Sequence, residues 1–97
     1  MVIIAKNAIN KFIDQEPNSK TVLLDWYEET KKADWSNFSE MKKTFNSVDA
    51  VGNGLFVFNI GGNKYRVIAR IIFKVRTIFI KFIGTHKQYD KVNLDDL

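Results

Sequence analysis

The stretch that decides the fold covers residues 55–83 and reads LFVFNI GG NKYRVIARIIF KVR TIFIKFI. Its apolar runs are rich in β-branched and aromatic residues, which favour extended strands. Gly61 and Gly62 separate the first two runs, and such a pair is typical of a hairpin because both glycines adopt positive φ without steric cost. Residues 74–76 mark a second turn. The stretch therefore predicts a three-stranded antiparallel meander.

The register of the first hairpin decides which side chains share a face. A two-residue Gly-Gly turn places Phe58 opposite Tyr65. Side chains then alternate between the two faces of each strand with a period of two. One face is apolar throughout, and we expect it to form the core: Phe56, Phe58, Ile60, Tyr65, Val67, Ala69, Ile71, Phe73, Ile78, Ile80 and Phe82.

The opposite face of this ribbon mixes cations with apolar residues. Arg66 and Arg70 project from the middle strand and Lys81 from the third, with Lys64 near the first turn. This surface can hold an anion. Alternatively, the cations merely keep the solvent face of an antiparallel sheet hydrated, as alternating polar residues usually do, and the hairpins alone leave both interpretations open. The other members expected on this face are Val57, Asn59, Ile68, Ile72, Phe79 and Ile83.

The composition describes one small domain. Of its 97 residues, 45% are hydrophobic and eight are Phe, which is enough for one packed core and too little for a second module. The chain contains no cysteine and one histidine, so disulfides and thiolate metal sites are excluded and a conventional zinc site is disfavoured. We therefore expect a single domain over residues 1–97, without a metal or cofactor.

Charge and hydropathy limit the classes of binding partner and the cellular compartments that we expect for this protein. The formal net charge is +4 at pH 7, a modest excess that suits a polyanion such as RNA. No apolar run approaches the ~18 residues that a membrane helix needs. The N-terminus lacks the basic and then apolar order of a signal peptide. We expect a cytoplasmic protein that does not bind membranes, and the absence of cysteine is compatible with that compartment.

Helical periodicity dominates the N-terminal half. Residues 2–5 predict a short edge strand, and residues 7–15 predict a first helix with Asn7 as its cap. A second helix runs from Asn18 or Ser19 to about Ala33, with apolar positions that recur at spacings of three and four. We expect these two helices to form a hairpin that packs on the sheet.

A short third helix precedes the sheet. Ser36 or Asn37 can cap it, and Lys42 and Lys43 lie at its end, where the helix dipole favours cations. The two lysines can reach a phosphate there, although a solvated helix end is the simpler interpretation. Residues 46–49 and 52–54 carry loop and turn signals. Because the helices come before the strands, we expect an α+β fold with the helices on one face of an antiparallel sheet and the other face open.

The end of the last strand collects residues suited to chemistry. His86 follows a Gly-Thr pair there, and Tyr89 lies three residues further on. With Arg66 and Arg70, they bring an imidazole, a phenol and fixed cations into one neighbourhood. Such groups can cleave RNA without a metal, because the RNA supplies its 2′-hydroxyl as nucleophile and the protein moves protons and stabilises charge on the phosphate. A lone histidine is nevertheless more often structural, and composition alone favours that interpretation.

Two motifs occur together in this chain, VFNIGGNKYRV at residues 57–67 and FIGTHKQYDK at residues 82–91. These motifs, at this distance from each other, resemble the HigB toxin family of type II toxin–antitoxin systems, a branch of the RelE/ParE superfamily. The N-terminal half agrees in LDWYEETKKADW at residues 24–35 and in MKKTF at residues 41–45. The resemblance spans nearly the whole chain, and it implies a single RelE/ParE-like domain.

The resemblance implies a small bacterial toxin that cleaves mRNA, typically on the translating ribosome, and that a helix-turn-helix antitoxin holds inactive. It implies that Arg66 contacts the scissile phosphate and that His86 and Tyr89 serve proton transfer and base stacking, without deciding which of them moves protons. No carboxylate stands out as a general base, since Asp90 can equally pair with a neighbouring lysine. Weaker candidates for contacts to the substrate backbone are Lys64, Arg70, Lys81, Lys42 and Lys43.

Three functions stay open from the sequence. The first is an endoribonuclease toxin that inhibits translation and arrests growth. The second is a toxin of the same fold that binds a protein target such as gyrase. The third is an RNA-binding module without catalysis, for which we expect salt-dependent affinity and no cleavage. A neighbouring reading frame that encodes a helix-turn-helix protein would favour the first two.

Overall fold

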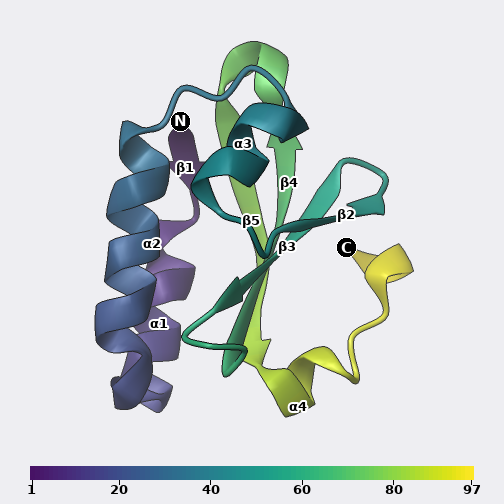
Figure 1. Ribbon diagram of the computed structural model, residues 1–97. Coiled ribbons are helices and arrows are strands. Elements are labelled where there is room, and N and C mark those ends of the chain that lie inside the picture. The colour runs from purple at the N-terminus through teal and green to yellow at the C-terminus, as the bar shows by residue number, and fades with distance from the viewer.

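A five-stranded sheet forms the centre of the computed structural model, which describes residues 1–97 (Figure 1). The first strand pairs in parallel with the last, and the other neighbouring strands are antiparallel. Three strands form the predicted meander, and the N-terminal residues form the predicted edge strand. Across the sheet the strands are β1 (Val2–Ile4), β5 (Thr77–Thr85), β4 (Tyr65–Ile72), β3 (Leu55–Ile60) and β2 (Asp49–Gly52).

The strand β2 is the one element of the sheet that sequence patterns did not predict. Loop and turn signals cover its bounds, and the expectation of a loop at Asp49 and Gly52 is wrong. The segment pairs antiparallel with β3, although a bulge interrupts the register between Ala50 and Gly52. The free edge of β3 offers backbone donors and acceptors, which pair with a segment of weak strand propensity.

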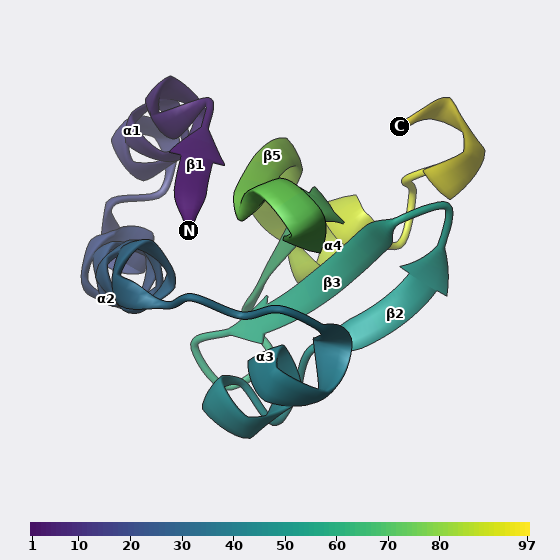
Figure 2. The same ribbon diagram turned by 90° about the horizontal axis from the view of Figure 1, so that it is seen from above.

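The three longer helices cover one face of the sheet, which confirms the predicted α+β class. The helices are α1 (Lys6–Gln15), α2 (Lys20–Lys32), α3 (Phe38–Thr44) and the short α4 (His86–Tyr89). The first two lie side by side, and the ammonium of Lys6 sits 4.8 Å from the ring centroid of Tyr27 (Figures 1 and 2). None of the helices has the combination of length and apolar sequence that a membrane crossing requires.

Two helix starts differ in how well local sequence predicted them. The helix α1 begins one residue before Asn7, so the prediction of Asn7 as its cap is wrong. Ala5 is the N-cap instead, with a left-handed φ of 78° that turns the chain from β1 into the helix. Of the two predicted caps of α3, Ser36 and Asn37, the structure has Asn37, whose side-chain oxygen accepts the N–H of Glu40 at 2.9 Å.

The main core lies between the helices and the sheet. Trp26 packs edge-on against Phe58, with ring centroids 5.2 Å apart. Phe38 of α3 stacks on Phe56 of β3 at 5.6 Å, which places α3 on this same face. The buried members of this core are Ile9, Phe12, Leu23, Trp26, Trp35, Met41, Val48, Phe56, Phe58, Ile60, Tyr65, Val67, Ala69, Ile71, Ile78 and Ile80.

The register of the first hairpin differs from the predicted one by two residues. Ile60 pairs with Tyr65, and Phe58 pairs with Val67 rather than with Tyr65. The reason is the turn, because Asn63 joins the two glycines at positive φ (74°) and the turn extends over four residues instead of two. A shift by an even number leaves each side chain on its expected face, so the face assignment of β3 and β4 holds.

A β-bulge in β5 exchanges two predicted positions. Ala69 pairs with Ile80, but the preceding residue, Ile68, pairs with Phe82, so Lys81 is the extra residue. A bulge of one residue moves every following side chain to the other face. Phe82 therefore lies on the far face instead of in the main core, and Ile83 packs against the main core instead of on the far face.

The far face of the sheet is not open, contrary to expectation. Leu55, Val57 and Ile68 form a second cluster of buried residues there. After α4 the chain turns back across this cluster and ends beside β2 and β3, on the side of the sheet opposite α3 (Figures 1 and 2). The partly buried residues that cover the second cluster are Val51, Phe82, Tyr89, Val92, Leu94 and Leu97.

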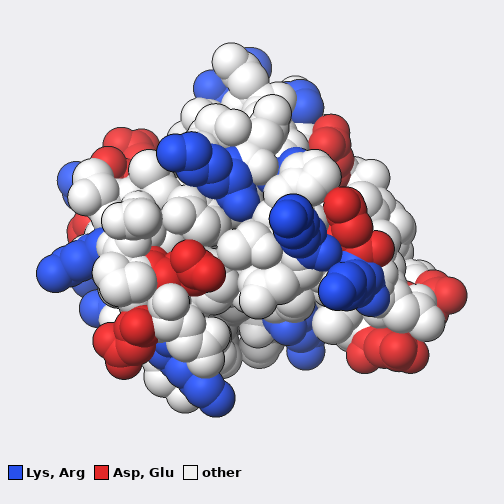
Figure 3. Space-filling model, turned by 90° about the horizontal axis from the view of Figure 1, so that it is seen from below, with Lys and Arg blue, Asp and Glu red and all other residues white.

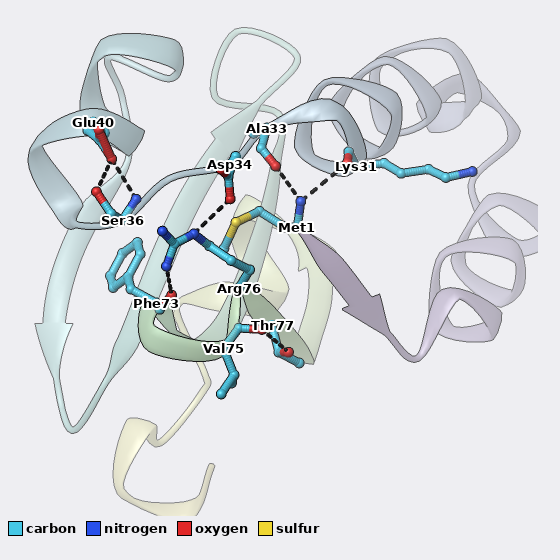
Figure 4. Close-up of polar contacts among 10 residues, drawn as sticks. All are labelled: Met1, Lys31, Ala33, Asp34, Ser36, Glu40, Phe73, Val75, Arg76 and Thr77. Atoms are coloured by element: carbon cyan, nitrogen blue, oxygen red, sulfur yellow. Dashed lines mark hydrogen bonds and ion pairs between the residues drawn. The ribbon is translucent and has the colours of Figure 1, made fainter.

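Polar contacts fasten the end of the sheet that lies away from α4 (Figure 4). Nε of Arg76 donates to the carboxylate of Asp34 at 2.7 Å, and its Nη1 donates to the carbonyl of Phe73 at 2.5 Å. The N-terminal ammonium of Met1 donates to the carbonyl of Ala33. These contacts join the loop after α2 to the turn between β4 and β5.

Candidate functional site

Strand pairing brings the start of β4 and the end of β5 together. Arg66 pairs with Gly84. The main-chain N–H of His86 donates to the carbonyl of Lys64 at 3.1 Å, which attaches the start of α4 to the turn before β4. Paired Cα atoms lie about 5 Å apart and two further residues add about 7 Å at most, so the Cα atoms of Arg66 and His86 are within about 12 Å. The structure thus places these two predicted residues in one neighbourhood.

Arg66 lies on the far face of the sheet and is only 8% exposed. Its Nη1 donates to the carbonyls of Asn63 at 2.9 Å and Tyr65 at 3.2 Å. Its Cζ lies 5.6 Å from the ring centroid of Tyr89, within the range of a cation–π contact. Both hydrogen bonds come from Nη1, so the donors on Nε and Nη2 have no acceptor in the protein. A phosphate that reached this guanidinium would meet those two donors.

The end of β5 is shaped by a capping box. The hydroxyl of Thr85 accepts the N–H of Gln88 at 3.2 Å, and the side chain of Gln88 accepts the N–H of Thr85 at 2.8 Å. This reciprocal pair starts α4 at the next residue, His86. His86 is therefore the first residue of α4, and its side chain is 55% exposed.

The imidazole of His86 lies close to the carboxylate of a residue whose role the sequence left open. Its Nδ1 lies 3.3 Å from Oδ2 of Asp90, one helical turn further on. The i, i+4 spacing in a short helix was the signal that could have predicted this pair. A carboxylate beside one imidazole nitrogen can orient the ring and leave Nε2 for proton transfer. No group of three or more His, Cys, Asp or Glu side chains is placed to hold a metal ion.

Tyr89 connects the site to the far face. It is half-buried, it packs against the second cluster, and its ring covers the guanidinium of Arg66. In this structure one face of the ring lies against Arg66, and that face becomes available for a base only where Tyr89 separates from Arg66.

Three further cations were candidates for contacts to the substrate backbone. Lys64 is exposed in the turn beside His86. Arg70 lies on the same face of β4 as Arg66, about 13 Å along the strand. Lys81 is exposed at the bulge and lines a hollow of about 350 Å³ between α1 and β5. The structure therefore brings Lys64 next to the His86 site, while Arg70 and Lys81 lie at a distance from it.

The two lysines of α3 lie on another part of the molecule. Their helix packs on the main core, which is the face opposite that of Arg66. Lys42 donates to the carbonyl of Val48 at 2.8 Å and lies 4.0 Å from the carboxylate of Asp49. Lys43 is exposed. The structure therefore does not bring Lys42 and Lys43 together with the other candidates.

The charge distribution around α4 is mixed. Seen from below, the surface carries Lys and Arg side chains interspersed with Asp and Glu side chains among uncharged residues (Figure 3). A surface of mixed sign attracts a polyanion less strongly than a continuous basic field does. Specific contacts such as those of Arg66 then contribute more to the binding of a phosphate than long-range attraction.

Comparisons with known proteins agree with the residues and the fold. Residues 19–92 match HigB_toxin, described as the RelE-like toxic component of a toxin-antitoxin system. The chain is 35% identical over 94 residues to an mRNA interferase HigB of Escherichia coli O6:H1 (strain CFT073), covering 95% of this chain and 91% of that protein. It is 30% identical over 92 residues to the mRNA interferase toxin HigB of Escherichia coli (strain K12), covering 93% of this chain and 88% of that protein. An mRNA interferase HigB of Shigella flexneri shows the same identity and coverage.

Proposed function

This chain belongs to the HigB family of RelE-like toxins, and we propose that it is an endoribonuclease that cleaves mRNA without a metal ion. The observation that carries the proposal is the meeting of Arg66, His86 and Tyr89 where β4 begins and β5 ends. Phosphodiester cleavage by an internal nucleophile requires proton transfer, for which the imidazole is suited, and stabilisation of charge on the phosphate, for which the fixed cation is suited. The aromatic ring can hold a base beside them.

The RNA supplies the nucleophile in the proposed reaction. Its 2′-oxygen attacks the adjacent phosphorus, the 2′-hydroxyl proton passes to a base, and the P–O5′ bond breaks as an acid protonates the leaving 5′-oxygen. His86 is the residue for proton transfer, because Asp90 lies 3.3 Å from its Nδ1 and orients the ring. Nε2 then faces the substrate.

The charge that develops on the phosphate needs a fixed partner. Arg66 supplies it through the donors on Nε and Nη2, which have no acceptor in the protein and which can form a bidentate contact with two phosphate oxygens. Tyr89 leaves its position over Arg66 when the substrate enters and stacks on a base, since an aromatic ring accepts any base face. Lys64, beside His86, contacts the RNA backbone.

The partners follow from the family. We propose that the substrate is mRNA on the translating ribosome, that the protein acts in the cytoplasm, and that a helix-turn-helix antitoxin neutralises it. The mixed charge on the face in Figure 3 supports a ribosome-bound substrate, because a face without a continuous basic field gains little affinity for free RNA from long-range attraction.

An in vitro translation reaction tests the function. The purified protein is added to it, and the 5′ ends of the mRNA are mapped with and without ribosomes. We expect new ends that depend on ribosomes with the wild type, none with His86→Ala, and undiminished ends with Lys87→Ala. Lys87 is the matched control because it is the exposed neighbour of His86 in α4. Circular dichroism checks that both variants fold.

Three results would contradict the proposal. Full cleavage by His86→Ala would remove His86 from the reaction. A wild type that arrests growth without new mRNA ends, and with DNA damage signalling, would instead indicate a toxin that binds a protein target such as gyrase. RNA affinity without cleavage would indicate a non-catalytic RNA-binding module.

A further inference from the structure

We propose that Asn63 is a positioning residue of the site, and that its left-handed main-chain conformation holds the guanidinium of Arg66 in the orientation that receives a phosphate. The proposal rests on the proposed function, since it explains how one residue of that same site is kept in place. Asn63 acts through its main-chain carbonyl, while its side chain is exposed in the turn before β4.

The turn between β3 and β4 contains three successive residues at positive φ. Gly61, Gly62 and Asn63 have φ values of 65°, 62° and 74°. The N–H of Lys64 then donates to the carbonyl of Gly61 at 3.3 Å. Asparagine is one of the few residues with a Cβ that tolerate this conformation. A change of Asn63 to an ordinary conformation would rotate the peptide plane that carries its carbonyl, so the left-handed conformation decides where this carbonyl points.

The carbonyl of Asn63 is one of two that restrain Arg66. Nη1 of Arg66 donates to it at 2.9 Å and to the carbonyl of Tyr65 at 3.2 Å. Tyr65 adjoins Arg66 in the chain and moves with it, so the contact with Asn63 is the one that ties the guanidinium to the turn. Because both hydrogen bonds use the same nitrogen, they set the rotation of the guanidinium and leave Nε and Nη2 together on its free edge.

This restraint matters most when Tyr89 moves. In the free protein the ring of Tyr89 also holds the guanidinium, with Cζ 5.6 Å from the ring centroid. In the proposed reaction Tyr89 leaves this position as the substrate enters. The two hydrogen bonds of Nη1 then keep Arg66 in place. A donor that is fixed before the reaction stabilises developing charge without a cost of reorganisation.

The simpler interpretation is that Asn63 only forms the hairpin turn. The chain offers an internal comparison, because Asn53 adopts φ 56° in the turn between β2 and β3. Both asparagines are exposed, and each adjoins a glycine at positive φ. They lie beyond opposite ends of β3, and the one that contacts Arg66 is Asn63. A residue that serves only its turn should respond to substitution as Asn53 does.

Valine at each position separates the two interpretations, because a β-branched residue is strongly disfavoured at positive φ. Cleavage is measured at several concentrations of mRNA–ribosome complexes. We expect Asn63→Val to lower kcat about tenfold with KM near the wild-type value, since the displaced donor acts on the transition state. Asn53→Val should keep the wild-type kcat despite the same backbone strain. Asn63→Gly should also keep it, because glycine restores the left-handed conformation.

A double variant tests whether Asn63 acts through Arg66. In an Arg66→Met background, Asn63→Val should cause no further loss of kcat. A further loss would overturn the proposal, because it would mean that Asn63 acts through another contact of the turn, such as that of Lys64 with His86. Circular dichroism checks that each variant folds. Asn63→Ala, which carries a smaller steric penalty, replaces Asn63→Val if the valine variant does not fold.

NMR spectroscopy of the free protein gives a measurement that needs no cleavage. The guanidinium signals of Arg66 are assigned by their loss in Arg66→Met, and the rate of rotation about its Cζ–Nη1 bond is measured. We expect faster rotation in Asn63→Val and an unchanged rate in Asn53→Val. Equal rotation rates in these two variants, or equal kcat values, would overturn the proposal. Failure of the proposed function is read separately, as a wild type that produces no new mRNA ends while rotation at Arg66 still responds to Asn63→Val.

Discussion

The guanidinium of Arg66 lies over the ring of Tyr89, with Cζ 5.6 Å from the ring centroid. The contact links a residue of the central strand to the segment that follows β5. The phosphate that we assign to Arg66 therefore competes with Tyr89 for the same cation. A change at Arg66 should therefore affect both the rate of mRNA cleavage and the free energy of unfolding, and the two effects can be measured separately.

Arg66→Met should lower mRNA cleavage by about 10²–10³, because a fixed donor to developing charge contributes on that scale. The variant should also lose about 1–2 kcal/mol of unfolding free energy, since two hydrogen bonds and a cation–π contact disappear. Arg66→Lys should recover little activity, because an ammonium lacks the planar pair of donors. Cleavage kinetics and urea titrations measure the two effects, and an active Arg66→Met variant would contradict the assignment.

Asp90→Asn should lower kcat about tenfold, less than His86→Ala, because Asp90 acts through the orientation of His86. KM should stay near the wild-type value, since neither change removes a contact to the RNA backbone. The double variant should be no worse than His86→Ala alone, as expected for two residues of one unit. Additive losses in the double variant would mean that Asp90 acts independently of His86.

Gly84→Ala should destabilise the protein by about 1–3 kcal/mol, as overpacking in a tight site does. A methyl group at Gly84 would fall on the ring of Phe82 and 2.9 Å from Oε1 of Gln88, which accepts the hydrogen bond of the capping box. Phe82→Leu in the same chain should restore part of the loss by removing the end of the ring. Thermal unfolding of the three proteins measures this, and an unchanged midpoint for Gly84→Ala would contradict the close packing.

Glu40 should make stability depend on pH in the acidic range. The hydroxyl and main-chain N–H of Ser36 donate to its carboxylate and lower the pKa of Glu40 below its ordinary value (Figure 4). A depressed folded-state pKa gives stability that is present above the unfolded pKa and is lost as pH falls through the folded one. Glu40→Gln should remove this part of the pH dependence, measured as urea midpoints in an acidic pH series. The same change of urea midpoint with pH in the wild type and in Glu40→Gln would show that the Ser36–Glu40 hydrogen bonds contribute nothing to the pH dependence of stability.

Ala5→Gly should stabilise the protein by about 1 kcal/mol, because a left-handed conformation carries a steric cost of that size for any residue with a Cβ. Ala5 adopts φ 78° at the start of α1. Ala8→Gly, inside the same helix, is the control and should destabilise by about 0.5–1 kcal/mol. Equal losses of unfolding free energy in Ala5→Gly and Ala8→Gly would mean that the left-handed conformation of Ala5 carries no net steric cost.

The sequence by itself determined the class of fold and the faces of β3 and β4. Alternation of apolar and polar residues separates these faces, and the four-residue turn shifted the register by an even number, which leaves every side chain on its side. Arg66 and Arg70 therefore lie on the face that the pattern predicted. The cap of α3 at Asn37 was also predictable, because its hydrogen bond is local.

Only the tertiary structure decided the features that depend on distant partners. The bulge at Lys81 placed Phe82 on the far face. The segment of β2 became a strand because it pairs with the free edge of β3. Residues 91–97 cover a face that the sequence predicted to be open, and Nη2 of Arg70 donates to the main-chain oxygen of Leu97, 27 residues away in the chain. A periodic pattern reports the preference of a segment for a conformation and a face. It carries no information about which remote segment covers that face, because that choice depends on the shape and charge of the assembled surface.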